Sequence, residues 1–139
     1  NIPELLDAAQ YDFVVDAIDT VTAKIALVMK CQEMGIPIIS SMGAGNKLDA
    51  SAFRVTDLYK TSMCPLAKVM RRELKKRGIK KLKVVYSEEK PMTPTQKERT
   101  ETETEETCAK RRAIPGSVAF VPSVAGLIAA GEVIKDLVK

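Results

Sequence analysis

Two short apolar runs, separated by one amphipathic segment of helix length, constrain the fold of this chain most strongly. Residues 11–17 indicate a buried strand that ends in an acid, and residues 36–40 form the second apolar run. Between them, Thr20 is placed to cap a helix that Gly35 would end. A strand, a helix and a strand within about thirty residues predict a βαβ unit, and hence an α/β fold with a parallel sheet.

The same alternation continues toward the middle of the chain. A third strand is expected over residues 53–58 and a further strand over residues 81–86. Between them a second helix is expected to begin at Pro65 and to end at Gly78. Its buried face is predicted to consist of four apolar residues: Leu66, Val69, Met70 and Leu74.

The end of the chain carries an uncharged stretch, residues 113–131, that is long enough to raise the alternative of a membrane span. Two prolines and three glycines in this stretch argue against a span. A strand over residues 117–121, followed by a helix that Ser123 caps, explains the pattern better.

Residues 87–113 differ in composition from the rest of the chain. They are rich in threonine and glutamate and contain few large apolar side chains, so they cannot bury enough surface to offset the entropy lost on ordering. We expect a long flexible loop in this region, and long loops in compact domains are often functional.

Basic residues are concentrated in the second helix and in the turn that follows it. Between Lys68 and Lys83 lie nine cationic side chains and one acid, a net charge of +8, although the whole chain carries only +4. Such a stretch fits a polyanionic partner, and a solvated helix face is the alternative. The candidate contacts are Arg71, Arg72, Lys75, Lys76 and Arg77.

The residue types that are absent exclude several chemistries. The 139 residues contain no histidine, so neither a histidine-based triad nor a histidine-ligated zinc site can form. The three cysteines form no CxxC pair, and we therefore expect no zinc site and reduced thiols in a cytoplasmic protein. The length suits one domain.

Two carboxylates follow the first predicted strand. Asp16 lies where a parallel strand ends, and Asp19 lies three residues later at the start of the next helix. A magnesium ion beside phosphate oxygens suits this pair, whereas an ordinary strand-end acid and a helix-capping acid are the alternative. After the next strand, Gly43 and Gly45 either approach a ligand with their backbone or simply form a turn.

Taken in order, these segments resemble the ThiF/MoeB/HesA family, the bacterial relatives of ubiquitin-activating enzymes. The resemblance covers nearly the whole chain apart from the polar loop, and it is closest to the branch that dehydrates threonylcarbamoyladenosine in tRNA. The residues that carry it are Val14-Val15-Asp16-Ala17-Ile18-Asp19, Ser41-Met42-Gly43-Ala44-Gly45, Val55-Thr56-Asp57-Leu58-Tyr59-Lys60-Thr61, Pro65-Leu66, Arg71 and residues 115–123.

The resemblance implies a Rossmann-like adenylating fold that uses ATP and Mg²⁺. The carboxylate of the modified adenosine would be adenylated, and ring closure would then expel AMP. Asp16 would be the catalytic residue and the Mg²⁺ ligand, the basic helix would bind tRNA, and the enzyme would be a homodimer. The residues implied to bind magnesium–ATP are Asp16, Ala17, Asp19, Gly43 and Gly45.

The family's glycine-rich nucleotide loop has no counterpart in these residues. We therefore expect residues 1–139 to be the C-terminal portion of a larger domain and to be inactive alone. One alternative within the family is adenylation of a ubiquitin-like sulfur-carrier protein, which the missing cysteine pairs disfavour. An alternative of another class is a non-catalytic RNA-binding module, which the basic stretch supports.

Overall fold

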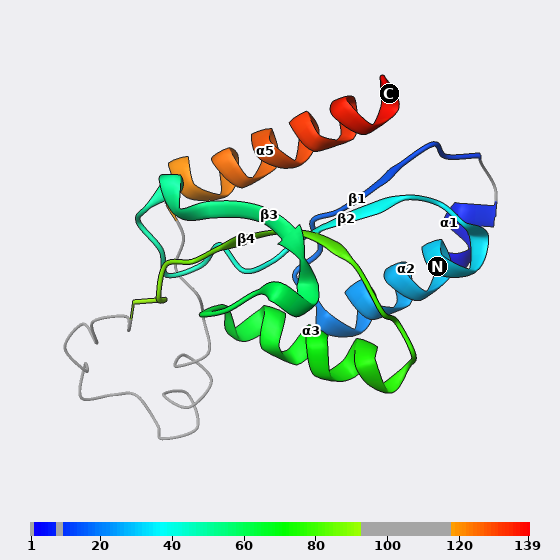
Figure 1. Ribbon diagram of the computed structural model, residues 1–139, viewed down its shortest axis with the longest axis horizontal. Helices are drawn as coiled ribbons and strands as arrows, with labels where there is room; N and C mark the ends of the chain where they lie inside the picture. Colours follow the sequence, from blue (N-terminus) through cyan, green and yellow to red (C-terminus); the bar gives the residue numbers. More distant parts are fainter. Residues whose placement is uncertain (1, 8–9, 93–117) are drawn as a thin grey trace, which may run out of the picture.

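Four strands form one mixed sheet in the order β1–β2–β4–β3 (Figure 1). β1 (Val14–Asp16) pairs in parallel with β2 (Ile38–Ser41), and β2 pairs in parallel with β4 (Lys83–Ser87). β3 (Phe53–Asp57) runs antiparallel to β4. This computed structural model describes residues 2–7, 10–92 and 118–139, and within them the predicted α/β fold with a mainly parallel sheet is confirmed.

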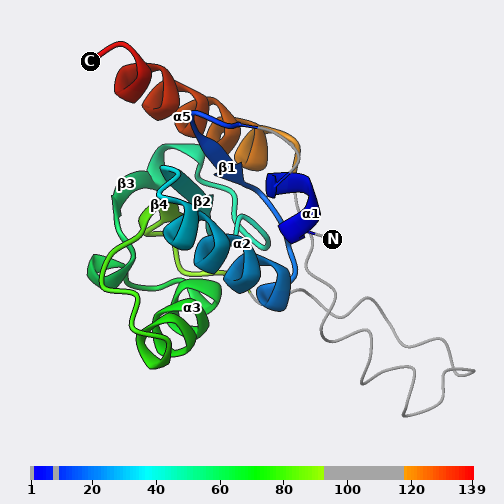
Figure 2. The same ribbon diagram turned by 90° about the vertical axis from the view of Figure 1, so that its right-hand side faces the viewer.

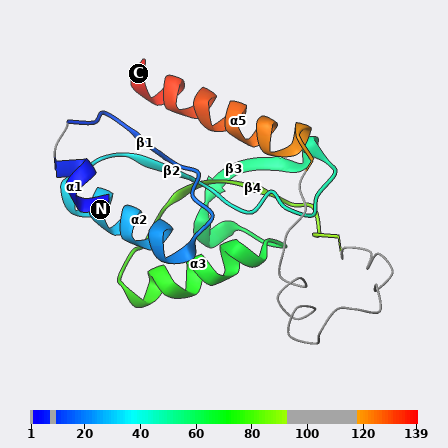
Figure 3. The same cartoon turned by 180° about the vertical axis from the view of Figure 1, so that it is seen from behind.

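Helices cover both faces of the sheet (Figures 2 and 3). α2 (Val21–Met34) and α3 (Pro65–Lys76) lie on one face, and the short α1 (Ile2–Asp7) packs on α2. α5 (Phe120–Leu137) lies on the other face. Two 3₁₀ turns flank β3, and they are η1 (Ala50–Ala52) and η2 (Leu58–Lys60).

The alternation of side chains along β2 separates two apolar layers. Ile39 packs against Val121 and Ala125 of α5, whereas its neighbour Ser40 must face the side of α2 and α3. On that second side, Met70 and Leu74 of α3 are completely buried. The predicted buried face of this helix is therefore correct in its centre, although Leu66 and Val69 remain half-buried.

Glycine ends α2 as its sequence predicts. Gly35 adopts a left-handed conformation with φ of 68°, and its cap N–H group bonds the carbonyls of Cys31 and Gln32. The prediction for the other end holds only in part. Thr20 occupies the N-cap position with extended backbone, but its side chain makes no capping hydrogen bond.

The predicted strand over residues 117–121 is wrong where the structure describes it. α5 already begins at Phe120 and has Ala119 as its N-cap, so Ser123 lies inside the helix rather than capping it. The Ser123 hydroxyl instead donates to the carbonyl of Ala119 at 2.5 Å. Pro122 fits the first helical turn, where a missing N–H group costs no intrahelical bond.

The predicted flexible loop lies outside the described residues from position 93 onward, as does Cys108. Its first predicted residue, Ser87, is still part of β4. Among the helices that the structure describes, none is long and apolar enough to cross a membrane.

The direction of the strands determines where polar segments meet. β1, β2 and β4 are mutually parallel, so their carboxyl ends share one edge of the sheet. The start of α3 is close to the same edge, because a methyl group added to Gly43, just after β2, would lie 3.8 Å from the Cys64 sulfur. α3 then runs away from this edge, toward the start of β4 (Figure 1).

Candidate functional site

Asp16, the last residue of β1, is completely buried at the carboxyl edge of the sheet. Its Oδ2 lies 3.0 Å from the Nζ atom of Lys24, which is also completely buried. Its Oδ1 accepts a hydrogen bond of 3.0 Å from the backbone N–H of Ile18. Both carboxylate oxygens therefore already have protein partners.

These contacts test whether Asp16 fits the expected magnesium ion. A divalent cation needs accessible oxygen ligands, and its charge would be repelled by the ammonium group already bound to Oδ2. Within the described residues there is also no group of three or more acids, cysteines or histidines that could hold a metal. As placed here, Asp16 does not fit the role of a direct Mg²⁺ ligand.

The turn that follows Asp16 exposes the next two predicted ligand residues. Ala17 and Asp19 are both open to solvent between β1 and the start of α2. The turn is fixed from inside by Asp16, through the N–H group of Ile18. Its outer surface is thus available for a ligand on a backbone that is held in place.

The glycine-rich loop after β2 lies at the same edge of the sheet, beside this turn. Gly43 and Gly45 are half-buried, and the loop is closed by Lys47, whose Nζ donates to the Gly43 carbonyl at 2.8 Å. A second tie comes from Glu89, whose carboxylate accepts from the backbone N–H groups of Leu48 and Asp49.

Lys47 is the second buried cation at this edge, with only 2% of its surface exposed. Burial lowers the pKa of Lys47, while negative charge on the nearby Cys64 and Glu89 side chains acts in the opposite direction. Cys64 is itself buried as the N-cap residue of α3. The loop after β2 and the start of α3 thus enclose a lysine between them.

The five basic residues predicted to contact tRNA, four in α3 and Arg77 as its C-cap, divide into three groups. Arg71 points inward and donates to the backbone carbonyl of Thr61 at 3.1 Å and to the Thr61 hydroxyl. Arg72, Lys76 and Arg77 surround the carboxylate of Glu73. Lys75 is exposed and makes no ion pair with any residue that the structure describes.

Glu73 partly neutralises its three cationic neighbours. Hydrogen bonds from Arg77 and Arg72 hold the pKa of the Glu73 carboxyl below its ordinary value. The five predicted tRNA contacts are therefore brought onto one helix, but they do not offer five free charges.

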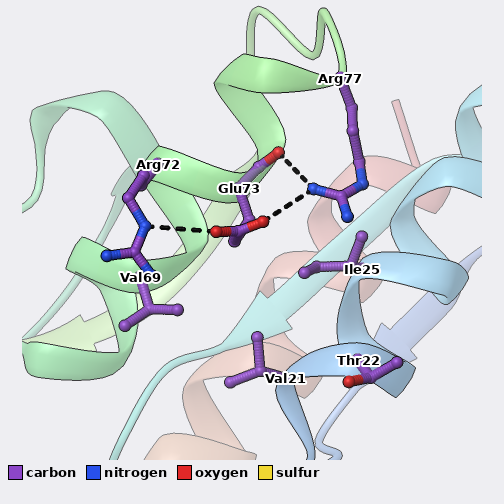
Figure 4. Close-up of a pocket in the computed structure, with 7 residues that line it drawn as sticks. All are labelled: Val21, Thr22, Ile25, Val69, Arg72, Glu73 and Arg77. Atoms are coloured by element: carbon purple, nitrogen blue, oxygen red, sulfur yellow. Dashed lines mark hydrogen bonds and ion pairs between the residues drawn. The ribbon is translucent and has the colours of Figure 1, made fainter.

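A pocket of about 310 Å³ lies between α2 and α3, beside this ion-pair cluster (Figure 4). Its floor is apolar and comes from Val21, Ile25 and Val69. Its rim carries Thr22 together with the Arg72–Glu73–Arg77 group, in which the two guanidinium groups point to one carboxylate. The predicted nucleotide residues are not part of its lining.

Two functional candidates, Lys24 and Lys47, escaped prediction from the sequence. A signal for Lys24 was present, because it shares one face of α2 with the buried residues Val28 and Cys31, four and seven positions later. A cation inside an apolar stripe needs a buried counter-charge, and Asp16 was the available acid. Lys47 lies in a loop without periodicity, so no comparable pattern marked it.

Comparison with known proteins identifies the class to which this arrangement belongs. The ThiF family model matches residues 1–139, and the chain is therefore a member of the ThiF family. It is 47% identical over 130 residues to the tRNA threonylcarbamoyladenosine dehydratase of Bacillus subtilis, a match that covers 92% of this chain and 51% of that protein. It is 49% identical over 81 residues to tRNA threonylcarbamoyladenosine dehydratase 2 of Saccharomyces cerevisiae, covering 58% of this chain and 18% of that protein.

Solved structures agree with this relationship. The Escherichia coli tRNA N6-threonylcarbamoyladenosine dehydratase in complex with ATP superimposes with a TM-score of 0.77 at 27% identity, covering 98% of this chain and 51% of that one. The AMP complex of the same enzyme gives 0.79 at 28% identity, over 99% and 52%. The chain thus spans about half the length of these relatives.

Proposed function

We propose that this chain forms part of an ATP-dependent site that dehydrates threonylcarbamoyladenosine in tRNA. The observation that carries the proposal is the meeting of two ligand-accessible segments, residues 17–19 and 43–46, at the carboxyl edge of adjacent parallel strands. Open α/β sheets bind their ligands in this crevice. The dehydratases of B. subtilis and E. coli, the latter solved with ATP and AMP, supply the reaction class.

The proposed chemistry has two steps. The carboxylate of the threonylcarbamoyl group attacks the α-phosphorus of ATP, and the bond to the departing pyrophosphate breaks. A nucleophilic atom of the carbamoyl group then attacks the activated carbonyl carbon and loses its proton, and the bond to AMP breaks. The net change in the nucleoside is the loss of one water.

Four residues are proposed to contact the nucleotide, and they are Ala17, Asp19, Gly43 and Gly45. Ala17 and Asp19 are exposed on a turn that Asp16 fixes from inside. At Gly43 an added methyl group would meet its nearest protein atoms at 3.8 Å, which is ordinary contact, so a bound ligand rather than the fold would require glycine there. Asp16 is not among these four residues and does not fit as a direct Mg²⁺ ligand, because both of its carboxylate oxygens have protein partners.

For tRNA we propose the exposed side of α3 as the backbone-binding surface. Lys75 carries a charge without an ion-pair partner among the described residues, whereas Arg72, Lys76 and Arg77 share Glu73. Phosphate groups compete with one carboxylate for these three cations, so they can still contribute to RNA binding. Arg71 is proposed to position Thr61 rather than to meet RNA.

A cytoplasmic homodimer completes the proposal. The outer face of α5 supports it, because three large apolar residues spaced seven apart are exposed there: Phe120, Leu127 and Ile134, at 55%, 72% and 61%. Seven-residue spacing places them along one side of a helix, where a second copy can bury them. Light scattering of the purified protein measures the assembly.

The function is tested in a chimera, since the chain spans about half of its relatives. The segment of the B. subtilis dehydratase that matches this chain is replaced by residues 1–139. With ATP, the chimera should convert threonylcarbamoyladenosine in tRNA to a nucleoside lighter by one water, as measured by mass spectrometry of digested tRNA. The 139-residue chain alone should release no pyrophosphate.

Matched variants of the chimera separate the alternatives. Gly43→Ala should keep its melting temperature and lose ATP affinity, while Lys75→Glu should keep ATP affinity and lose tRNA affinity. A folded chimera that binds tRNA but leaves it unchanged with ATP would support the non-catalytic RNA-binding alternative. Pyrophosphate exchange with a sulfur-carrier protein, but not with tRNA, would support carrier adenylation.

A further inference from the structure

The pairing of Asp16 with Lys24 is the most completely buried polar contact that the structure describes at the carboxyl edge. Neither side chain is exposed, and their charged atoms are 3.0 Å apart. The two residues come from different elements, since Asp16 ends β1 and Lys24 lies in the first half of α2. A charge pair in the interior is kept only while both members are present, because either alone would be an uncompensated buried charge.

A third polar side chain adjoins this pair. Ser40 of β2 is the register partner of Asp16, so both side chains leave the sheet on the same face, toward α2. Ser40 is completely buried, and its hydroxyl has no hydrogen-bond partner among the residues that the structure describes. Lys24 uses one of its three donors on Asp16.

The electrostatic consequence bears on metal binding. The carboxylate of Asp16 already has a positive charge at Oδ2 and an N–H donor at Oδ1. A second cation at the same carboxylate would be repelled by the ammonium group of Lys24 in an interior of low dielectric constant. The ammonium group of Lys24 therefore already balances the charge of the Asp16 carboxylate, and no metal ion is needed for this.

We propose that Asp16 is a positioning residue held by Lys24, and that the ammonium group occupies the place where a metal-binding aspartate would hold its divalent cation. The pair joins the end of β1 to α2 and, through the N–H group of Ile18, fixes the turn that carries Ala17 and Asp19. This inference does not depend on adenylation, because it concerns a contact between two side chains of this chain.

The first test measures metal binding by the 139-residue chain. Electron paramagnetic resonance of free Mn²⁺ gives the affinity for the wild type, Asp16→Asn and Asp19→Asn. We expect Asp16→Asn to leave Mn²⁺ affinity within about twofold of the wild type, whether that binding is strong or undetectable. A loss of tenfold or more in Asp16→Asn, with circular dichroism unchanged, would overturn the proposal.

The second test measures the turn itself by amide hydrogen exchange. Lys24→Met should accelerate exchange of the Ile18 amide, which donates to Asp16, by roughly tenfold or more, and Ala129 in α5 should change little. Lys24→Arg, which keeps a cation at this position, should exchange as slowly as the wild type at the same amide. Exchange at the turn that stays within about twofold of the wild type in a folded Lys24→Met protein would show that the pair does not position it.

A third variant covers the case in which Lys24→Met fails to fold. The double variant Asp16→Leu/Lys24→Met removes both charges and also the acceptor of the Ile18 N–H group. It should melt at a higher temperature than Lys24→Met, because no charge is left unpaired. Its turn should exchange as fast as that of an unfixed loop. A double variant with the same protection as the wild type would also overturn the proposal.

Discussion

The ammonium group of Lys47 donates a 2.8 Å hydrogen bond to the carbonyl oxygen of Gly43, four residues earlier. This single contact closes the loop after β2 with a cation that is 98% removed from solvent, since only 2% of the residue is exposed. The loop that is proposed to approach a nucleotide is therefore held by a buried charge rather than by apolar packing alone.

Replacement of this lysine changes the response of stability to pH. Burial lowers the pKa of Lys47 below its ordinary value of 10.5, so the unfolded chain binds more protons than the folded chain between these two pKa values. The free energy of unfolding of the wild type therefore rises with pH between the folded pKa of Lys47 and 10.5, and this increase is complete above 10.5. Lys47→Met has no group that titrates at this position, so its free energy of unfolding lacks this increase.

Urea unfolding of both proteins from pH 7 to pH 11 measures the difference. At neutral pH we expect Lys47→Met to lose about 1–3 kcal/mol, because the Gly43 carbonyl loses its donor. The gap between wild type and variant should widen as the pH rises toward 10.5. A gap that narrows over this range contradicts the assigned burial of the charge.

The ion pair between β4 and α5 predicts a dependence on acid. Lys83 lies 2.9 Å from Asp136, and this contact lowers the pKa of the Asp136 carboxyl below 3.8. The stabilisation is present above the unfolded pKa of 3.8 and is lost as the pH falls through the lower folded value. Asp136→Asn should lower the melting temperature at pH 7, and the difference from wild type should disappear below the folded pKa. Calorimetry at pH 2–7 measures both effects.

Arg71 and Lys75 should have opposite phenotypes although they belong to the same basic helix. Arg71→Ala should cost about 1–3 kcal/mol of stability, because the hydrogen bonds of its charged group to Thr61 are lost. Lys75→Ala should leave stability within about 0.5 kcal/mol and reduce the salt dependence of tRNA affinity by close to one phosphate contact. Denaturant unfolding and filter binding at several salt concentrations distinguish them. If the two variants changed both stability and tRNA affinity to the same extent, Arg71 and Lys75 would not have the separate roles proposed here.

Ser40→Ala removes a hydroxyl that has no hydrogen-bond partner in the described part of the chain. Burying such a group costs about 1–3 kcal/mol, so its deletion should leave the free energy of unfolding unchanged or raise it by about 1 kcal/mol. Denaturant unfolding gives the value directly. A loss of more than about 1 kcal/mol would indicate that the hydroxyl is bonded in solution, with a buried water as its partner.

Local patterns were sufficient for most of the fold. The stop at Gly35 and the start at Pro65 both hold, because each depends on neighbours within one helical turn. The strand predicted over residues 11–17 is present but shorter, Val14–Asp16, and Val15 in it is exposed rather than buried. The end of the chain shows where such patterns fail. A short apolar run fits a strand or the first turn of a buried helix equally well, and packing on the sheet decides for the helix that starts at Phe120.

The candidate site was predictable only as a set of residue types at one edge. The exposed turn with Asp19 and the loop with Gly43 meet there because parallel strands end together. The ion pair of Asp16 with Lys24 depends on the packing of α2 against β1. The hydrogen bond from Lys47 to the Gly43 carbonyl depends on the path of a loop. The helical spacing of Lys24 indicates that it is buried but not which acid it meets, and Lys47 lies in a loop without a period. The structure was therefore needed to find both contacts.

The length of α3 sets the distance between the crevice and the exposed lysines at the end of this helix. The helix begins beside Gly43 and ends at Lys76, and its 12 residues correspond to about 18 Å at 1.5 Å per residue. The far end, with Lys75 and Lys76, is therefore too distant from the crevice for one nucleoside to reach both. A substrate gains from both ends only if it is a polymer. For the proposed tRNA substrate, the length of the RNA would therefore be a condition of recognition in addition to the identity of its modified base.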